Sequence, residues 1–328
     1  MSIVEEKILR AVSAYNMLEA GDRIVVGLSG GADSVTLLHG LKRLEKELGI
    51  ELYACHINHN LRGRESDGDQ AFAQQLCESL GVDIRVFSVD VTGELKKHQS
   101  TEEKARELRY DAFKKISESL NAKVATAHNA CDNSETVLLN ILRGTGLKGL
   151  CGIPPKREYI IRPLLFCTRE EIEGYICENG LKYVTDKTNL STAYTRNKVR
   201  LEVMPRLTEI NPSLHAGISR MTSSLIEDSL FLEGMAKEAL DKARIENGVY
   251  LTEALLALPK PIFTRAVSLM LKEKGVEPSA LRINGIAEII RSGRGKINLE
   301  KNKFAAVKKG KAEIQLIPQK YRDKNAPK

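Results

Sequence analysis

The stretch Val26–Ser34 (V-G-L-S-G-G-A-D-S) joins two apolar segments through two adjacent glycines, two serines and one aspartate. The apolar segment before it, Ile24–Leu28, predicts a strand, and the apolar spacing from Val35 to Leu48 predicts a helix. A turn between a strand end and a helix start presents unpaired backbone amides, and the helix dipole favours an anion there. The stretch therefore predicts a phosphate-binding loop in an α/β domain.

Each residue type in this loop has a chemical use. Gly30 and Gly31 permit positive φ angles and close approach of the backbone to a ligand, and Ser29 and Ser34 can add hydroxyl donors. The loop is not a Walker A loop, since it lacks the lysine of that motif. Asp33 would repel phosphate unless a divalent cation lay between them. A tight strand-to-helix turn without a ligand is the alternative on local grounds.

Strand-like and helix-like segments alternate over the first 165 residues. This alternation predicts right-handed crossovers and a parallel sheet with helices on both faces. We therefore expect a doubly wound, mostly parallel α/β sheet, with ligands beyond the carboxyl ends of its strands. Further strands are expected at 51–57, 84–89 and 123–127, a helix at 72–80, and capping boxes at Ser100–Glu103 and Thr168–Glu171.

The sequence pattern changes near Arg196. We expect a catalytic domain over residues 1–210 and a smaller, mainly helical domain over 211–328 that ends in a β hairpin or meander and a loose basic tail. Residues 1–195 carry 25 Lys+Arg and 28 Asp+Glu, net −3, whereas residues 196–328 carry 25 and 15, net +10. A basic C-terminal part favours a nucleic-acid partner, and the alternative is a solvated basic surface.

Composition excludes several classes of protein. No apolar run reaches the ~18 to 20 residues that span a bilayer, and the N-terminus lacks a signal-peptide pattern, so we expect a cytoplasmic protein without a membrane partner. The six cysteines form no C-x-x-C pair, which argues against a thiolate zinc site or a disulfide scaffold.

Several motifs follow the glycine-rich loop in order. They are H-I-N-H-N-L-R-G (56–63), the Glu102, Ala105-Arg106, Arg109-Tyr110 pattern, A-H-N-A-C-D-N-S-E-T (127–136), I-R-P-L-L (161–165), and D-x-x-N with R-N-x-x-R (Asp186, Asn189, Arg196, Asn197, Arg200). With S-G-G-x-D-S they resemble the tRNA(Ile)-lysidine synthetases, a family of N-type ATP pyrophosphatases with a PP-loop. The resemblance is dense from residue 20 to about 210.

That resemblance implies an activity. ATP would adenylate the C2 oxygen of the wobble cytidine in an isoleucine tRNA with a CAU anticodon, and L-lysine would then displace AMP. The implied ATP contacts are Ser29, Gly30, Gly31, Ala32, Asp33 and Ser34, with Asp33 also holding Mg²⁺. His59 is a further candidate for nucleotide contact, and Arg143 begins a candidate anion-contacting turn, for which the alternative is a helix C-terminus followed by a flexible loop. A homodimer is a further expectation.

Asp132 and Glu135 lie three residues apart near a helix start, which places both carboxylates on one face. In the family the matching pair lies near the incoming lysine, so the two residues would bind its ammonium group, and one would accept a proton. The alternative is a pair of acids that complements the helix dipole. Cys131 stands where many relatives carry another acid.

Arginines supply the candidate phosphate contacts. We expect Arg106 in the catalytic site, and Arg196 and Arg200 on the tRNA, because guanidinium groups match phosphate oxygens. The alternative is ion pairing with neighbouring acids. His56 and His128 are expected to act in capping or nucleotide contact rather than as metal ligands.

Two other functions compete with lysidine formation. A PP-loop tRNA 2-thiolation enzyme would be expected to carry paired cysteines, which this sequence lacks. A non-catalytic adenine-nucleotide-binding module would need the loop and the sheet, but neither the acid pair nor a basic second domain.

Overall fold

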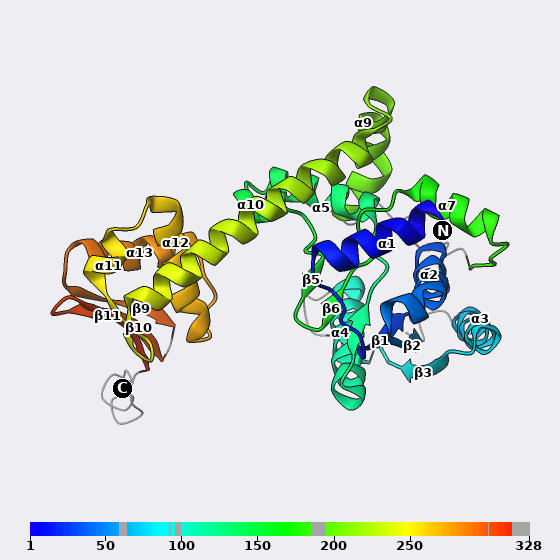
Figure 1. Ribbon diagram of the computed structural model, residues 1–328, viewed down its shortest axis with the longest axis horizontal. Helices are drawn as coiled ribbons and strands as arrows, with labels where there is room; N and C mark the ends of the chain where they lie inside the picture. Colours follow the sequence, from blue (N-terminus) through cyan, green and yellow to red (C-terminus); the bar gives the residue numbers. More distant parts are fainter. Residues whose placement is uncertain (59–63, 92, 96–99, 185–194, 301, 317–328) are drawn as a thin grey trace. The chain divides into compact units, whose positions relative to one another are not determined.

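The computed structural model describes residues 1–58, 64–91, 93–95, 100–184, 195–300 and 302–316. The chain forms two compact units, residues 1–223 and 224–328 (Figure 1). Helix α10 (Leu214–Ala243) contributes residues to both units. The expected boundary between residues 210 and 211 stays a prediction.

A six-stranded sheet with the order β3-β2-β1-β4-β6-β5 forms the centre of the first unit. Every neighbouring pair is parallel except β5 with β6, which confirms the expected doubly wound, mostly parallel sheet. The pair β5–β6 was not expected, because strands of two residues carry no periodic signal. The strands are β1 (Arg23–Gly27), β2 (Glu51–Asn58), β3 (Asp83–Ser88), β4 (Lys123–Ala125), β5 (Lys156–Arg157) and β6 (Ile160–Ile161).

Both faces of this sheet are covered. In β1, Ile24 and Val26 pack in the core formed with α1, α2, α3 and α7, whereas Val25 packs in the core formed with α4. All three are fully buried, as the central strand of a two-sided sheet requires. The helices are α1 (Ile3–Ala14), α2 (Ala32–Leu48), α3 (Arg64–Leu80), α4 (Thr101–Leu120), α5 (Ala130–Leu142), α6 (Leu147–Leu150) and α7 (Arg169–Glu178).

Capping boxes fix the starts of several helices. The boxes expected at Ser100 and Thr168 are present and open α4 and α7. The structure adds boxes at Ser2, which opens α1, and at Asn129, which opens α5. Such caps satisfy backbone amides that the first turn leaves unpaired. The cap at Asn129 therefore fixes the end of α5 that carries the expected acid pair.

A short helical segment follows the sheet. It consists of α8 (Thr195–Lys198), the π-helical turn η2 (Val199–Val203) and α9 (Met204–Ile210), and it leads into α10. Val199 and Met204 pack against Leu139 of α5, so the segment is anchored beside the acid-bearing helix. π-Helical turns often lie at functional sites.

The second unit has its own core, formed by the end of α10, three helices and an antiparallel sheet with the order β7-β8-β11-β10-β9. The expected helices and final β meander are confirmed, whereas β7 and β8 were not expected. The basic tail at residues 320–328 lies outside the described residues. The elements are β7 (Arg244–Glu246), β8 (Val249–Leu251), α11 (Thr252–Leu256), α12 (Lys260–Glu273), α13 (Ala280–Arg291), β9 (Gly295–Glu300), β10 (Lys303–Lys308) and β11 (Lys311–Leu316).

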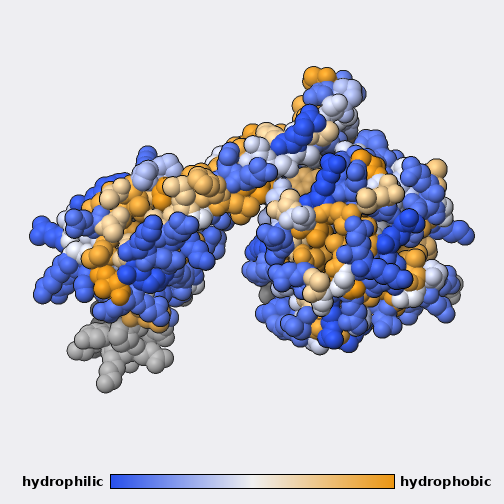
Figure 2. Space-filling model, viewed as in Figure 1, coloured by the Kyte–Doolittle hydropathy of each residue, from blue (hydrophilic) through white to orange (hydrophobic). Residues whose placement is uncertain are grey.

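Lysines gather at the β10–β11 turn of this unit. Lys309 and Gly310 form the two-residue turn with φ angles of 52° and 72°, and the exposed Lys308 and Lys311 flank it. Two positive φ angles are typical of a type I′ hairpin turn. Hydrophilic side chains, blue in Figure 2, cover much of the face of this unit in view. Among the described helices, none is long and apolar enough to span a membrane.

Candidate functional site

The glycine-rich loop connects the carboxyl end of β1 with the start of α2. Gly31 is the N-cap of α2, and Gly30 adopts a φ of 88°, which a side chain would strain. The amide of Ser29 donates to Ser34 Oγ at 3.2 Å, and Ser34 Oγ donates to the carbonyl of Gly31 at 2.9 Å. The Ser29 hydroxyl lies 3.1 Å from Ser34 Oγ, so both serine hydroxyls, expected as ligand donors, are also bound within the loop.

Asp33 lies in the first turn of α2, where Arg169 and Asn129 contact it. Oδ1 of Asp33 accepts from Nδ2 of Asn129 and from Nη1 of Arg169, each at 3.1 Å. Burial raises the pKa of the Asp33 carboxyl, the attraction of Arg169 opposes that rise, and the nearby Asp132 adds to it. An acid that is half-buried beside another acid favours the arrival of a cation.

The donor set fits magnesium bound together with a nucleotide. Within the described part of the chain, both contacts to Asp33 fall on Oδ1, so Oδ2 is available to a cation. In the same part, no group of three or more His, Cys, Asp or Glu side chains could hold a metal. Mg²⁺ needs no such group, since it keeps several waters and is bound by one or two carboxylates and substrate phosphates.

A cavity of about 830 Å³ opens beside Asp33. With Asp33 of α2, its lining includes Asp132 and Glu135 of α5, Arg169 of α7 and Arg200 of η2, so elements that are far apart in the sequence meet there. A cavity of this size suits a ligand as large as a nucleotide. The other lining residues are Asn129, Cys131, Met204, Pro205, Thr208, Glu209, Pro212 and His215.

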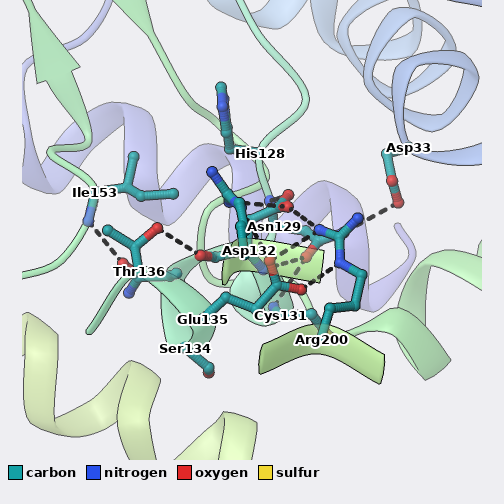
Figure 3. A network of polar contacts seen from close by, with 12 residues as sticks. Asp33, His128, Asn129, Cys131, Asp132, Ser134, Glu135, Thr136, Ile153 and Arg200 are labelled. Atoms are coloured by element: carbon teal, nitrogen blue, oxygen red, sulfur yellow. Dashed lines mark hydrogen bonds and ion pairs between the residues drawn. The ribbon is translucent and has the colours of Figure 1, made fainter. Parts of the chain in front are cut away.

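The two acids of α5 are ion-paired with two arginines. Arg200 Nε lies 2.5 Å from Glu135 Oε1, and Arg200 Nη2 lies 2.9 Å from Asp132 Oδ1. Arg196 Nε lies 3.1 Å from Glu135 Oε2, and Arg196 Nη2 lies 3.5 Å from Asp132 Oδ1. Figure 3 shows Arg200 directed at both carboxylates. The expected lysine-binding acids and the expected tRNA-binding arginines therefore form one cluster.

Burial strengthens this cluster. Glu135 is only 3% exposed, and a carboxylate at such a depth requires a charged partner. Burial opposes the charged form of Arg200, but the hydrogen bonds and charges of Glu135 and Asp132 outweigh it and raise the pKa of Arg200. Ion pairing, the alternative use of Arg196 and Arg200, is thus present for both.

Comparison with known proteins assigns the family. A PP-loop domain family matches residues 2–207. The tRNA(Ile)-lysidine synthase of Clostridium perfringens is 35% identical over 333 residues, which cover 98% of this chain and 71% of the relative. The chain belongs to the tRNA(Ile)-lysidine synthase family.

Other comparisons agree with this family. The tRNA(Ile)-lysidine synthase of Clostridioides difficile is 44% identical over 74% of this chain and 53% of its own length. The chain spans about half the length of the first curated relatives that it matches. The U34-tRNA thiolase NcsA of Methanococcus maripaludis, solved with its [4Fe-4S] cluster, matches with a TM-score of 0.56 over 68% of this chain and 78% of that chain. At 22% identity, that likeness concerns the fold alone.

Two arginines expected in the lysidine synthase site lie outside the cavity lining. Arg106 of α4 is exposed, donates to the hydroxyl of Tyr110 at 3.3 Å and lies over its ring. Arg143 is exposed at the end of α5 opposite to the acids, about 12 Å along the helix axis from Glu135 and about 16 Å from Asp132. Neither of them lines the cavity beside Asp33, and their expected contacts with ATP and the reacting groups stay predictions.

Two of the expected histidines, His56 and His128, hydrogen-bond neighbouring residues near the carboxyl ends of the strands. His56 Nδ1 hydrogen-bonds the carbonyl of Leu28 at 2.9 Å and so supports the start of the PP-loop from β2. His128 Nδ1 contacts the Thr126 hydroxyl at 3.0 Å, and burial lowers the pKa of His128. His59, together with Asp186 and Asn189 of the family motif, lies outside the described residues.

Cys131 is a thiol rather than a thiolate. Burial raises the pKa of Cys131 to about 11, although its sulfur also accepts the backbone N–H of Arg169. A thiol that stays protonated is a poor nucleophile. All six cysteines lie in the described part of the chain, and none of them forms a disulfide.

The sequence analysis did not predict three parts of the site. They are Arg169, Asn129 and the six cavity-lining residues from Met204 to His215. One signal could have found Arg169, since the capping box at Thr168 places it at the first position of its helix. Asn129 precedes the expected acid pair and could have been read as an N-cap.

Proposed function

We propose that this chain ligates L-lysine to C2 of the wobble cytidine of an isoleucine tRNA with a CAU anticodon, with release of AMP and pyrophosphate. The observation that carries the proposal is the meeting of the PP-loop acid Asp33 and the acid pair Asp132 and Glu135 at one cavity, in a member of this family. The activity would make the chain a ligase that forms a carbon–nitrogen bond.

The first half-reaction uses the PP-loop. The C2 oxygen of cytidine attacks the α-phosphate of ATP, and pyrophosphate leaves. The backbone from Ser29 to Ser34 would bind the departing pyrophosphate, because the loop precedes the N-terminus of α2. Mg²⁺, held by Asp33 and the phosphates, would neutralise developing charge. Arg106 would contact the phosphate of the adenylated cytidine only after its side chain leaves the hydroxyl of Tyr110.

The second half-reaction uses the acids of α5. The amine of lysine attacks C2 of the adenylated cytidine, and AMP leaves. Asp132 and Glu135 would bind the lysine side chain through its ammonium group, and one of them would accept the proton that the amine loses. Both acids are paired with arginines in the structure, so lysine must replace at least one guanidinium group.

Phosphates of bound RNA can replace the carboxylates of α5 as partners of the two arginines. Arg196 and Arg200 are 32% and 38% exposed at their side chains, so their outer nitrogens are within reach of a ligand. Guanidinium groups bind phosphate as well as carboxylate. We therefore propose that bound tRNA draws these arginines away from the acids, while the exposed lysines of the second unit bind the tRNA backbone.

The two competing functions gain no support. The relatives with the higher identities are named tRNA(Ile)-lysidine synthases, and the likeness to the thiolase is one of fold. A cytoplasmic location and a homodimer stay predictions.

The test is a reconstituted reaction. The protein is incubated with ATP, Mg²⁺, labelled lysine and transcripts of isoleucine tRNA with CAU or GAU anticodons. Label in the CAU transcript alone, with AMP formed in step, is expected. Label in both transcripts or in neither contradicts the proposal.

A further inference from the structure

The side chain of Arg169 extends to the PP-loop from a different element. Its Nη1 lies 3.1 Å from Asp33 Oδ1, and its Nε lies 2.8 Å from Glu173 Oε1, one turn further along α7. The side chain of Arg169 is 40% exposed, and it lines the same cavity as Asp33. It is therefore a cation positioned beside the expected phosphate site with access to a ligand.

The backbone of Arg169 is fixed, whereas its side chain can move. Thr168 caps the helix, Glu171 is bound by Lys7 at 2.6 Å, and the N–H of Arg169 contacts the sulfur of Cys131. Within α7 the charge of Arg169 has opposing effects, because a cation in the first turn opposes the helix dipole whereas the ion pair with Glu173 one turn further on supports the helix. Neither effect depends on the contact with Asp33, which therefore requires a reason outside the helix.

Helix α7 is connected to the PP-loop at a second point. Beyond its end, the amide of Val184 donates to the carbonyl of Gly30 at 2.9 Å, and the side chain of Val184 contacts Gly30. The loop is thereby held from the start of α7 through Arg169 and from the segment after α7 through Val184. Both contacts therefore fall on the loop that would bind the phosphates of ATP.

We propose that Arg169 binds the pyrophosphate part of ATP, to which its guanidinium group transfers from Asp33 when the nucleotide arrives. This deepens the proposed function and rests on its assignment of the ATP site. Without nucleotide, Asp33 needs a counter-charge, which Arg169 supplies. With nucleotide, Mg²⁺ takes over that role, and the phosphate oxygens accept the freed N–H groups of Arg169. Glu173 would hold Nε throughout and so limit the movement to the outer nitrogens.

Nucleotide binding without tRNA or lysine tests the proposal. The probes are AMP and an ATP analogue with a methylene group between the α and β phosphorus atoms, measured by calorimetry with Mg²⁺ on the full chain. For Arg169→Gln, we expect the analogue to bind about tenfold more weakly and AMP to bind as before, because one charge-assisted contact is lost. Arg169→Lys should retain part of the affinity.

A matched control is Arg23→Gln. Arg23 also forms an exposed ion pair, with Glu51 at 2.9 Å, but it lies at the amino end of β1, away from the loop. The Arg23→Gln variant should bind AMP and the ATP analogue with the affinity of the wild-type protein. Analogue affinity that stays within about twofold of wild type in Arg169→Gln, or an equal loss for AMP, would overturn the proposal.

The proposed lysidine reaction can be refuted independently of the proposed role of Arg169. If the analogue results hold but no lysine enters tRNA, the role of Arg169 stands and the lysidine reaction is refuted. If the wild-type protein binds neither the analogue nor ATP, both are overturned.

Discussion

Arg200 Nε lies 2.5 Å from Oε1 of Glu135, so an arginine expected to bind RNA neutralises an acid expected to bind lysine. Removing this guanidinium group should leave Arg196 as the remaining arginine paired with the carboxylates of α5, so that the ammonium group of lysine displaces one guanidinium group fewer. We predict that Arg200→Gln binds lysine several-fold more tightly than wild type when no tRNA is present. Equilibrium dialysis with labelled lysine measures the change.

Arg206→Gln is the control for this prediction, since Arg206 is 79% exposed and pairs with Glu209 on α9. It should leave lysine binding unchanged. Arg200→Gln should also unfold more easily, by about 1–3 kcal/mol, because Glu135 loses a hydrogen-bonded partner. Weaker lysine binding in Arg200→Gln would indicate that the arginine contacts lysine directly and would contradict the exchange.

Asp33→Asn should abolish AMP formation and leave the fold intact. Burial raises the pKa of Asp33, so its ionised form is disfavoured in the folded state. At neutral pH the neutral amide avoids that cost, and the midpoint of thermal unfolding should be equal to or above that of wild type. A rate assay for AMP and a thermal melt decide both points.

Asp22→Asn gives the matched comparison. Asp22 precedes the amino end of β1 and pairs with Lys123 at 2.6 Å. Its replacement should lower stability slightly and leave AMP formation near normal. Near-normal AMP formation in Asp33→Asn would refute the metal-holding role of that acid.

Gly30→Ala should weaken ATP binding, because alanine disfavours the positive φ that the loop adopts at this position. Gly30 has a φ of 88°, and Gly21 has a φ of 90° with nothing near its missing Cβ. Alanine at either position should cost about 1–2 kcal/mol of stability, because a side chain disfavours this conformation. Only Gly30→Ala should also reduce ATP affinity, as calorimetry with both variants would reveal. An equal effect of the two variants on ATP would exclude a direct role for the loop.

The lysines at the β10–β11 turn should bind RNA. We predict that replacing Lys308, Lys309 and Lys311 together by Glu weakens tRNA binding by at least about tenfold and flattens its salt dependence, with ATP affinity unchanged. The control replaces three exposed lysines of the first unit, Lys46, Lys114 and Lys115. A filter-binding titration at several salt concentrations compares them, and equal losses would indicate a general charge effect.

Local signals in the sequence predicted the elements well. Strand β1, the start of α2 and the capping boxes at Ser100 and Thr168 depend on neighbouring residues, and all are present. The alternation of strands and helices predicted a parallel sheet, but the strand order β3-β2-β1-β4-β6-β5 was not predicted. The two-residue strands β5 and β6 could not be foreseen, because their pairing depends on the completed sheet.

The partners within the site were harder to predict. Arg169 meets Asp33 across 136 residues, and Arg200 meets Glu135 across 65. Such contacts depend on how helices far apart in the sequence are placed in the folded domain, and local propensity does not determine that placement. An arginine also binds a carboxylate or a phosphate equally well, so the sequence left both uses of Arg196 and Arg200 open.

The most direct test of the central claim is transfer of labelled lysine to an isoleucine tRNA with a CAU anticodon. We predict that label enters the tRNA only when ATP and Mg²⁺ are present, with AMP and pyrophosphate formed in equal amounts to the lysine incorporated. A folded protein that binds ATP and this tRNA but transfers no lysine would contradict the account.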